Sequence, residues 1–254
     1  MKIRIADLPV EWQDDKKDFV KAFVADFKEK PVMTISFKNK LPECHGIQYT
    51  ELDCAHTLRV ESGEILCADA DWGKVSSYYH SPIQEYTLTL AAICSKFSYY
   101  DTVLMHASCV DINGSGIIFT GYSGVGKTTQ ASLWNKYADA DIINGDKILI
   151  REINNEFFAY GLPWKGSSEY CLNKRTNLKA IVVLRQAREN KLTPLNSVGA
   201  TELAIPHFFL PYWDEKCTDN ACKTIDKIFR NVPVFLLECR PDESAVKLVK
   251  NTVF

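Results

Sequence analysis

The stretch Gly116-Ile-Ile-Phe-Thr-Gly-Tyr-Ser-Gly-Val-Gly-Lys-Thr128 joins an apolar run to a glycine-rich turn and the start of a more polar segment. Its last eight residues fit the phosphate-loop pattern G-x-x-x-x-G-K-[ST] without a mismatch. Residues 116 to 120 predict a strand, and residues 128 to 137 predict a helix. A strand, a glycine-rich turn and a helix start, in this order, are the context that a phosphate-binding loop requires.

The chemistry expected of this loop follows from its residue types. Glycines allow consecutive backbone N–H groups to point inward and cradle phosphate oxygens, and the helix N-terminus adds partial positive charge. Lys127 is expected to reach the β- and γ-phosphates, and the Thr128 hydroxyl is expected to bind Mg²⁺. The sequence therefore predicts ATP and Mg²⁺ as ligands. The residues expected to contact them are Gly121, Ser123, Gly124, Val125, Gly126, Lys127, Thr128 and Thr129.

Two further residues are candidates for the chemistry. A Mg²⁺-nucleotide site needs a carboxylate near the loop, to orient the metal or to accept a proton. Asp146 lies just past a strand expected around Ile142-Ile143 and is the leading candidate for both roles. His106 lies on the strand that precedes the loop strand, where a lone histidine is more often structural than functional.

Composition sets the broad class. The chain has 254 residues, is 46% hydrophobic and 24% charged, and carries a net charge of −2, so nucleic acid and anionic membranes are not expected partners. It has no apolar run of the roughly 20 residues that span a membrane, and its first seven residues lack the apolar region typical of a secretory signal, so neither is expected. Its nine cysteines are scattered without a C-x-x-C pair, which favours free thiols in a reducing cytoplasm.

The pattern of elements predicts an α/β protein with a mixed sheet. Residues 1–82 are expected to form a smaller β-rich region, with a helical insert at 15–28 and a hairpin that turns at Ser62-Gly63. Residues 83–254 are expected to form the nucleotide-binding domain, which begins with a helix at 83–97. Asn113-Gly114 predicts an antiparallel hairpin that leads into the phosphate loop, which is unusual among phosphate-loop proteins. Asn154-Asn155 predicts another hairpin, and residues 180–184 and 234–239 predict strands. Asp242 is expected to cap a final helix at 243–253.

Taken together, these residues resemble the HPr kinase/phosphorylase group, which is related to the phosphoenolpyruvate carboxykinase P-loop fold. The matching pieces are Met105-His106, residues 110–116, the phosphate loop and Asn144-Gly-Asp146. The resemblance continues more loosely through residues 160–166, 178–184 and 232–241. It therefore covers about residues 85 to 254 and includes the antiparallel hairpin before the loop.

The resemblance implies an HPr kinase-like core, an active-site role for His106, and Asp146 as the acidic residue that binds metal, accepts a proton or does both. It also implies oligomers, a choice between ATP and pyrophosphate as donor, and a link to modified-peptide pathways, including kinases of lasso-peptide precursors. One departure stands out. The family typically carries two adjacent aspartates, whereas this chain has Gly145-Asp146, so either Asp146 does both jobs or His106 accepts the proton.

Two functions follow as hypotheses. The first is a Mg²⁺-dependent kinase with Lys127, Asp146 and His106 in its catalytic site and with Thr128 and Asp146 as metal ligands. It would transfer the γ-phosphoryl group to Ser or Thr of a peptide or protein, or to a small-molecule hydroxyl. Residues 163–166 and 173–175 are candidates for an acceptor-side loop, in which Lys165 or Arg175 would neutralise transferred charge. The second hypothesis is a regulator that binds ATP without transferring phosphate. The glycine at position 145, in place of the family's first aspartate, and the unmatched N-terminal region favour this hypothesis. Neither the acceptor nor an oligomer interface can be read from the sequence.

Overall fold

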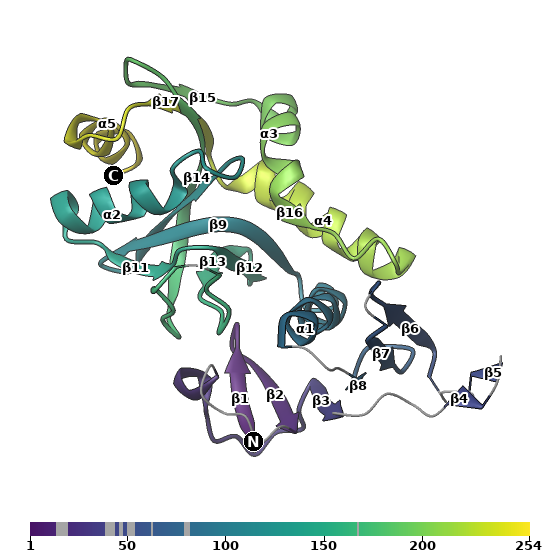
Figure 1. The fold of residues 1–254 in the computed structure, drawn as a ribbon. Coiled ribbons are helices and arrows are strands. Elements are labelled where there is room, and N and C mark those ends of the chain that lie inside the picture. The colour runs from purple at the N-terminus through teal and green to yellow at the C-terminus, as the bar shows by residue number, and fades with distance from the viewer. Residues whose placement is uncertain are drawn as a thin grey trace.

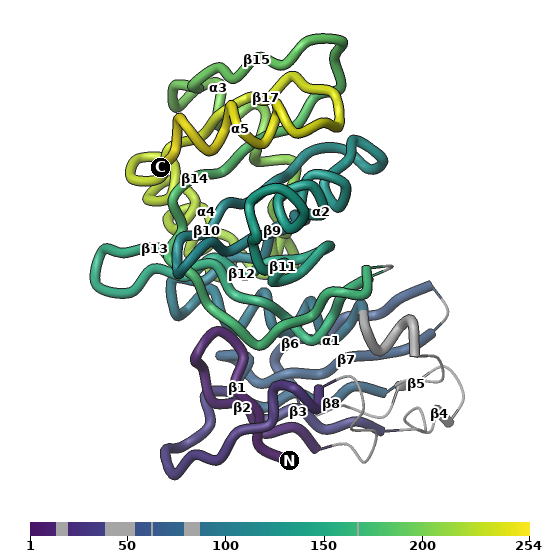
Figure 2. Tube along the Cα trace, turned by 90° about the vertical axis from the view of Figure 1, so that its left-hand side faces the viewer, coloured from purple at the N-terminus to yellow at the C-terminus, as the bar shows by residue number. Residues whose placement is uncertain are grey.

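In the described residues the strands form two large mixed sheets and one two-stranded sheet, and helix α1 (Pro82–Ser98) lies between the two large sheets (Figure 1). The computed structural model describes residues 1–13, 20–38, 44–45, 48–49, 54–61, 63–78, 82–166 and 168–254, with the backbone alone at 44–45, 48–49 and 82–86. Figure 2 shows the N-terminal strands at one end of the molecule and the C-terminal helices at the other.

The N-terminal sheet has six strands in the order β1-β2-β3-β8-β7-β6. Both its edges are antiparallel, while β2, β3 and β8 run parallel at its centre. The strands are β1 (Lys2–Ile5), β2 (Leu8–Gln13), β3 (Met33–Lys38), β6 (His56–Arg59), β7 (Ile65–Ala68) and β8 (Lys74–Tyr78). The short strands β4 (Cys44–His45) and β5 (Gln48–Tyr49) pair with each other. The predicted hairpin is present as β6 and β7, with Gly63 at a positive φ of 98°.

One N-terminal prediction is wrong in the part that the structure describes. The helical insert expected at 15–28 is only the single 3₁₀ turn η1 (Lys21–Phe23), and residues 14–19 lie outside the described residues. The chain then runs beside β1, where Val24 forms an isolated antiparallel bridge to Ile3 and Ala25 N–H donates to Lys2 O at 3.1 Å. Pairing with a neighbouring strand has replaced the local helical tendency.

The second sheet carries the phosphate loop. Its strands follow the order β10-β9-β12-β13-β14-β17-β15, and β10 also pairs parallel with β14, so five of the strands form a closed circuit of pairings. β11 and β16 each pair with β9. The strands are β9 (Thr102–Ile112), β10 (Ser115–Thr120), β11 (Asp141–Asn144), β12 (Lys147–Ile153), β13 (Glu156–Tyr160), β14 (Arg175–Gln186), β15 (Lys191–Pro194), β16 (Phe208–Phe209) and β17 (Val234–Cys239).

The predicted elements around the loop are confirmed. Asn113 and Gly114 turn with positive φ values of 51° and 85°, and β9 and β10 pair antiparallel. Asn154 and Asn155 likewise turn between β12 and β13. The chain is therefore an α/β protein with a mixed sheet, as expected. Among the described residues, no helix combines the length and the apolar character that crossing a membrane requires.

Alternating side chains of the central strands pack against helices on both faces of this sheet. Ile117 and Phe119 of β10 face α2 (Lys127–Ala138) and α5 (Glu243–Val253), whereas Ile118 faces the opposite layer. That layer contains α3 (Ser197–Ala204), the 3₁₀ turn η2 (Ile205–His207) and α4 (Glu215–Asn231). Because side chains alternate along a strand, a continuous apolar run is what burial on both faces demands. The Asp242 side chain caps α5 as predicted, accepting from the N–H groups of Ser244 and Ala245.

The N-terminal sheet shares a hydrophobic core with the rest of the chain. Trp12 and Phe97 are fully buried in one cluster that also contains Leu149 and Trp164. A buried polar contact crosses the same junction, where the Trp72 indole N–H donates to the Asp214 carboxylate at 2.9 Å. Asp214 is 9% exposed and also caps α4, where it accepts from Cys217 N–H. The two sheets are therefore linked by apolar packing and by a hydrogen bond to a buried charge.

Replacing Trp72 by Phe tests this link. The substitution removes the donor but keeps an aromatic ring, so Asp214 loses a hydrogen bond in a buried position. We expect the free energy of unfolding to fall by about 1–3 kcal/mol, measured by urea denaturation. Tyr212→Phe is the control, since Tyr212 is 84% exposed. If the two variants unfold at the same urea concentration, the contact contributes nothing to stability.

Candidate nucleotide-binding and catalytic site

The phosphate loop connects the end of β10 to the start of α2. Gly121 and Gly126 have φ values of 144° and 111°, which residues with a side chain rarely adopt. A Cβ at Gly121 would also lie 3.2 Å from the carbonyl oxygen of Leu184, so the loop is packed closely against β14. Gly126 is the N-cap of α2, and the N–H groups of the first helical turn have no intrahelical partners. The loop therefore places backbone N–H donors next to the N-terminus of α2, as an anion-binding site requires.

Lys127 lies inside this loop. It is 8% exposed, and its ammonium group donates to the carbonyl oxygens of Gly121 at 3.0 Å and Tyr122 at 3.2 Å. Burial lowers the pKa of Lys127, and the negative charge of Asp146 opposes that shift. Among the described residues, the hydrogen-bond partners of the buried ammonium are neutral carbonyls, which a phosphate oxygen can replace with a stronger charge-assisted hydrogen bond.

Thr128 and Asp146 lie at the same corner of the site. The Thr128 hydroxyl donates to Gly145 O at 3.3 Å, and Asp146 is the next residue. The side-chain oxygen of Asn144 accepts from the N–H groups of Asp146 at 2.9 Å and Lys147 at 3.2 Å, which fixes this turn. The Asp146 carboxylate forms a close ion pair with Lys147. Three further phosphate-loop residues, Ser123, Gly124 and Thr129, are exposed to solvent, and their contact with a nucleotide stays a prediction.

His106 lies on β9 opposite Lys147 of β12, next to the loop. The Thr120 hydroxyl donates to His106 O at 2.9 Å, so the histidine is tied to the end of the strand that enters the loop. Burial and the charge of Lys127 lower the pKa of His106, the charge of Asp146 opposes this, and Lys147 adds to the lowering. At neutral pH the imidazole is therefore neutral and able to accept a proton. The fold brings His106, Lys127, Thr128 and Asp146 together, and their catalytic roles stay predictions.

A covering loop, defined as residues 161–166 and 168–172, crosses this corner. The Asn144 amide donates to Leu162 O at 3.1 Å and Trp164 O at 3.0 Å, and Leu172 N–H donates to Ile143 O at 2.9 Å. Lys165 lies in this loop and is exposed. Arg175, the other candidate for an acceptor-side cation, instead pairs with Asp7 at 2.8 Å. The role suggested for Arg175 from the sequence therefore has no support from its placement.

The covering loop explains the glycine at position 145. A Cβ added to Gly145 would overlap the Ser168 hydroxyl and lie 2.7 Å from Ser168 Cβ. A Cβ at Gly166 would lie 2.6 Å from the Asp146 carboxyl group. A second carboxylate at position 145 does not fit beside Asp146 while the covering loop is in place.

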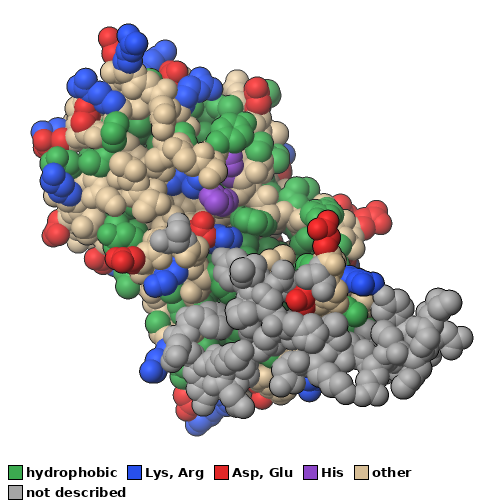
Figure 3. All heavy atoms as spheres, in the orientation of Figure 1, with side chains coloured by type: hydrophobic (Ala, Val, Ile, Leu, Met, Phe, Trp, Pro, Cys, Tyr) green, Lys and Arg blue, Asp and Glu red, His purple; other side chains and the backbone are tan. Residues whose placement is uncertain are grey.

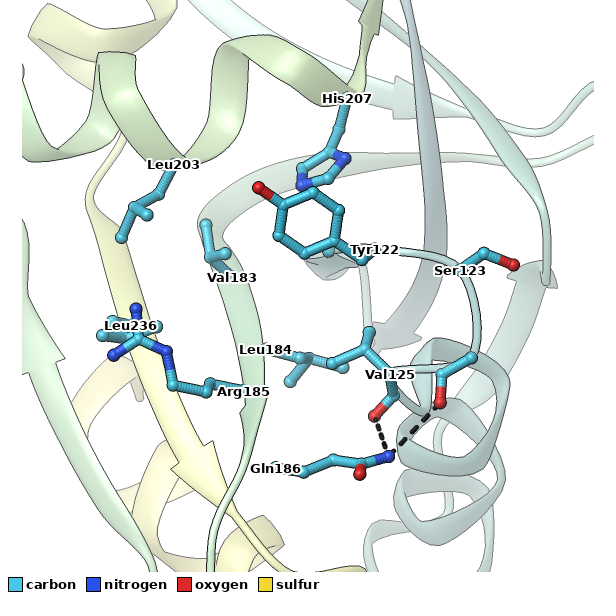
Figure 4. A pocket seen from close by; sticks show the side chains of 12 residues that line it. Tyr122, Ser123, Val125, Val183, Leu184, Arg185, Gln186, Leu203, His207 and Leu236 are labelled. Carbon is cyan, nitrogen blue, oxygen red and sulfur yellow. Dashed lines mark hydrogen bonds between the residues drawn. The ribbon is translucent and has the colours of Figure 1, made fainter.

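A cavity of about 320 Å³ opens on the other side of the phosphate loop (Figure 4). Tyr122 and His207 line it with their rings edge to face, 5.4 Å apart between centroids. The Gln186 amide donates to the carbonyls of Gly124 and Val125, at 3.3 and 3.4 Å, and so ties the loop to the end of β14. The remaining walls are largely apolar and include Val183, Leu184, Leu203 and Leu236. Figure 3 shows histidine side chains beside basic side chains (Lys or Arg) near the middle of the face drawn there.

His207 is a site residue that the sequence analysis missed. It is 8% exposed, and β16, which follows it, pairs with β9 beside His106. Burial lowers the pKa of His207, and the charges of Lys127 and His106 lower it further. No local pattern around Ile205-Pro-His207 marks the residue, because only the pairing of β16 with β9 brings it to the loop.

The residues present fit a Mg²⁺-nucleotide complex. Within the described residues no cluster of three or more His, Cys, Asp or Glu side chains forms a metal site. Mg²⁺ in nucleotide sites is usually held by one or two carboxylates together with substrate phosphates and water. Thr128 and Asp146 supply a hydroxyl and a carboxylate at the corner where a phosphate held by Lys127 would lie.

Comparison with solved structures finds 49 chains that resemble this one, among them a bacterial kinase/phosphatase. The HPr(Ser) kinase/phosphatase from Coxiella burnetii is similar over 59% of this chain and 95% of its own, with 12% sequence identity and a TM-score of 0.37. No protein-family model matches the chain. No curated protein matches it either.

The position of His207 predicts a pH dependence of stability. Its pKa is lowered in the folded protein, so the unfolded chain binds the proton more readily as pH falls below the usual histidine value of about 6.5. The stability contributed by neutral His207 is therefore present above about pH 6.5 and is lost as pH falls towards the folded-state pKa. We expect His207→Gln to lose less stability between pH 7 and pH 5 than the unsubstituted protein, measured by urea denaturation. An equal loss in both proteins would contradict this account.

The contact between Gly145 and Ser168 predicts a compensating pair of substitutions. Gly145→Ala forces a methyl group into the space of the Ser168 side chain and should lower the free energy of unfolding by about 1–3 kcal/mol. Ser168→Gly removes the obstructing atoms, so the double variant should recover most of that loss. Thermal unfolding of the two single variants and the double variant measures the coupling. Additive effects would show that the two residues do not meet.

Proposed function

We propose that the protein is a Mg²⁺-dependent phosphotransferase that moves the γ-phosphoryl group of ATP to a hydroxyl group. The observation that carries this proposal is the buried Lys127 ammonium inside the glycine-rich loop, with Thr128, Asp146 and His106 around the same corner. A phosphate-binding loop alone serves many proteins. A carboxylate and a neutral imidazole beside it favour transfer chemistry.

Each group has a defined task in this proposal. Backbone N–H groups of residues 123–128 and the α2 N-terminus bind phosphate oxygens, and Lys127 neutralises charge on the transferred group. Thr128 and Asp146 would hold Mg²⁺, which supplies positive charge to the phosphate oxygens when bound. Asp146 or the neutral His106 accepts the proton of the acceptor hydroxyl. Because the transition state is loose and the proton leaves late, loss of the base costs less rate than loss of charge stabilisation.

The cavity beside Tyr122 and His207 supports a nucleotide as the donor. β10, β14 and β17 run parallel, and ligands of parallel sheets bind at the carboxyl ends of the strands. Asp146 and His106 lie on the β9 side of the loop, so the rest of a bound nucleotide extends towards β14 and this cavity. Its apolar walls and the Tyr122 ring suit a nucleobase. Pyrophosphate is a second candidate donor, because the loop binds phosphates without requiring the base.

The acceptor is proposed by class. A serine or threonine hydroxyl of a peptide or protein, such as a modified-peptide precursor of the lasso-peptide kind, or a small-molecule hydroxyl, fits the site's chemistry. We place the protein in the cytoplasm, which agrees with the free thiols of its described cysteines. Neither nucleic acid nor a membrane is proposed as a partner, given the net charge of −2.

One observation favours the second hypothesis, an ATP-binding regulator without transfer activity. The Asp146 carboxylate is engaged with Lys147, and position 145 has no room for a second carboxylate. A site with a neutralised acid would bind MgATP but transfer phosphate slowly. Tight binding without a phosphorylated product from any acceptor would identify the protein as this regulator.

Phosphate transfer from γ-labelled ATP to candidate peptides and small hydroxyl compounds tests the proposal. Lys127→Ala should abolish transfer, because it removes the charge that stabilises the transferred group. Asp146→Asn should lower the rate by about 10²–10³-fold and leave nucleotide binding measurable. Lys191→Ala, at an exposed position of β15, is the control and should transfer like the unsubstituted protein. Equal transfer by all four proteins would reject the assigned site.

A further inference from the structure

The covering loop places a serine hydroxyl against the catalytic corner. It is fixed to β11 at both ends, through the Asn144 amide at Leu162 and Trp164 and through the bond from Leu172 N–H to Ile143 O. Ser168 N–H donates to Lys165 O at 2.9 Å, which makes a turn between these anchors. Ser168 is therefore held in place by backbone hydrogen bonds.

The Ser168 side chain points to Gly145, which lies between the two proposed metal ligands. The space that a Cβ of Gly145 would fill is taken by the Ser168 hydroxyl, and Thr128 Cγ2 lies 3.8 Å from the same point. Thr128 also donates to Gly145 O. On the other side, Gly166 packs against the Asp146 carboxyl group. Ser168 thus reaches the corner where the transferred phosphoryl group and the proton acceptor would meet.

The Ser168 hydroxyl accepts a hydrogen bond, and its own proton is free to be transferred. Ser168 Oγ accepts from Tyr170 N–H at 3.2 Å, a bond that orients the oxygen. Within the described part of the chain, no group accepts its proton in return. A phosphoryl acceptor requires a hydroxyl whose proton is uncommitted, and the Ser168 hydroxyl packs against Gly145, the residue before Asp146.

From this geometry we propose that Ser168 is a self-phosphorylation site, an inference that rests on the proposed phosphotransferase function. The Ser168 oxygen attacks the γ-phosphorus of ATP, a new O–P bond forms, and the bond between the γ-phosphorus and the β,γ-bridging oxygen breaks. ADP leaves with that oxygen, and the serine proton passes to the Asp146 carboxylate. The products are phosphoserine at position 168, ADP and one proton.

The reaction is favoured because the acceptor belongs to the same chain. An acceptor held near the reacting phosphate replaces a bimolecular encounter by an intramolecular step, which is a large rate advantage. Lys165 in the same loop and Lys147 at the corner supply positive charge near a phosphoserine, which carries about −1.5 to −2 charges at neutral pH. The loop that covers the site therefore offers both the hydroxyl and cations for its product.

The test uses the full-length protein, treated with phosphatase, freed of the phosphatase and incubated with MgATP. We expect intact-mass measurement to show one added phosphoryl group, and peptide mapping to place it on Ser168. The rate constant should not change when the protein is diluted tenfold, because the step is intramolecular. Ser168→Ala should reduce incorporation to background, whereas Ser167→Ala, its sequence neighbour, should retain it. Lys127→Ala should show none, which excludes a contaminating kinase.

Binding of MgATP, measured by calorimetry on the same samples, separates the two proposals. If the protein binds MgATP and phosphorylates an added acceptor while Ser168 stays unmodified, this inference fails and the proposed function stands. Label on another residue, or a rate that rises with protein concentration, also overturns it. If the protein neither binds MgATP nor forms any phosphorylated product, the proposed function fails and the inference fails with it.

Discussion

The site depends on one buried charge, the Lys127 ammonium held by the carbonyls of Gly121 and Tyr122. Burying an ammonium group costs free energy unless the group is hydrogen-bonded. Here the carbonyls of the loop's own backbone accept those hydrogen bonds. The positive φ values at Gly121 and Gly126 make that backbone shape accessible, and the same shape directs N–H groups towards an anion. The backbone shape that binds the Lys127 ammonium is therefore also suited to binding phosphate.

Strand pairing around the phosphate loop determines which side chains lie near the Lys127 ammonium. The hairpin β9–β10 places His106 one strand away from the loop, and the pairing of β12 with β9 brings Asp146 and Lys147 to the same edge. The covering loop packs over this corner, because the Asn144 amide donates to backbone carbonyls of the loop. Packing accounts for the glycine at position 145, because Ser168 occupies the space that an aspartate side chain at this position would need.

Local features of the sequence were enough to predict much of this. The phosphate loop, the Asn113-Gly114 turn, the final strand and the Asp242 cap each depend on residues within a few positions of one another. The helix expected at 15–28 is absent from the described residues 20–28, because Val24 and Ala25 pair with β1 instead. The presence of His207 and Ser168 at the site could not be predicted from the sequence for a related reason. Each arrives at the site through contacts between residues far apart in the chain, from β16 to β9 and from the covering loop to β11.

The most direct measurement is a crystal structure of the protein with Mg²⁺ and a non-hydrolysable ATP analogue. The account predicts that the phosphate chain lies in the loop of residues 121–128, and that Lys127 Nζ leaves the carbonyls of Gly121 and Tyr122 for a phosphate oxygen. It also predicts a metal ion between Thr128 and Asp146. A nucleotide bound elsewhere, or a Lys127 that keeps its carbonyl partners at saturating nucleotide, would contradict it.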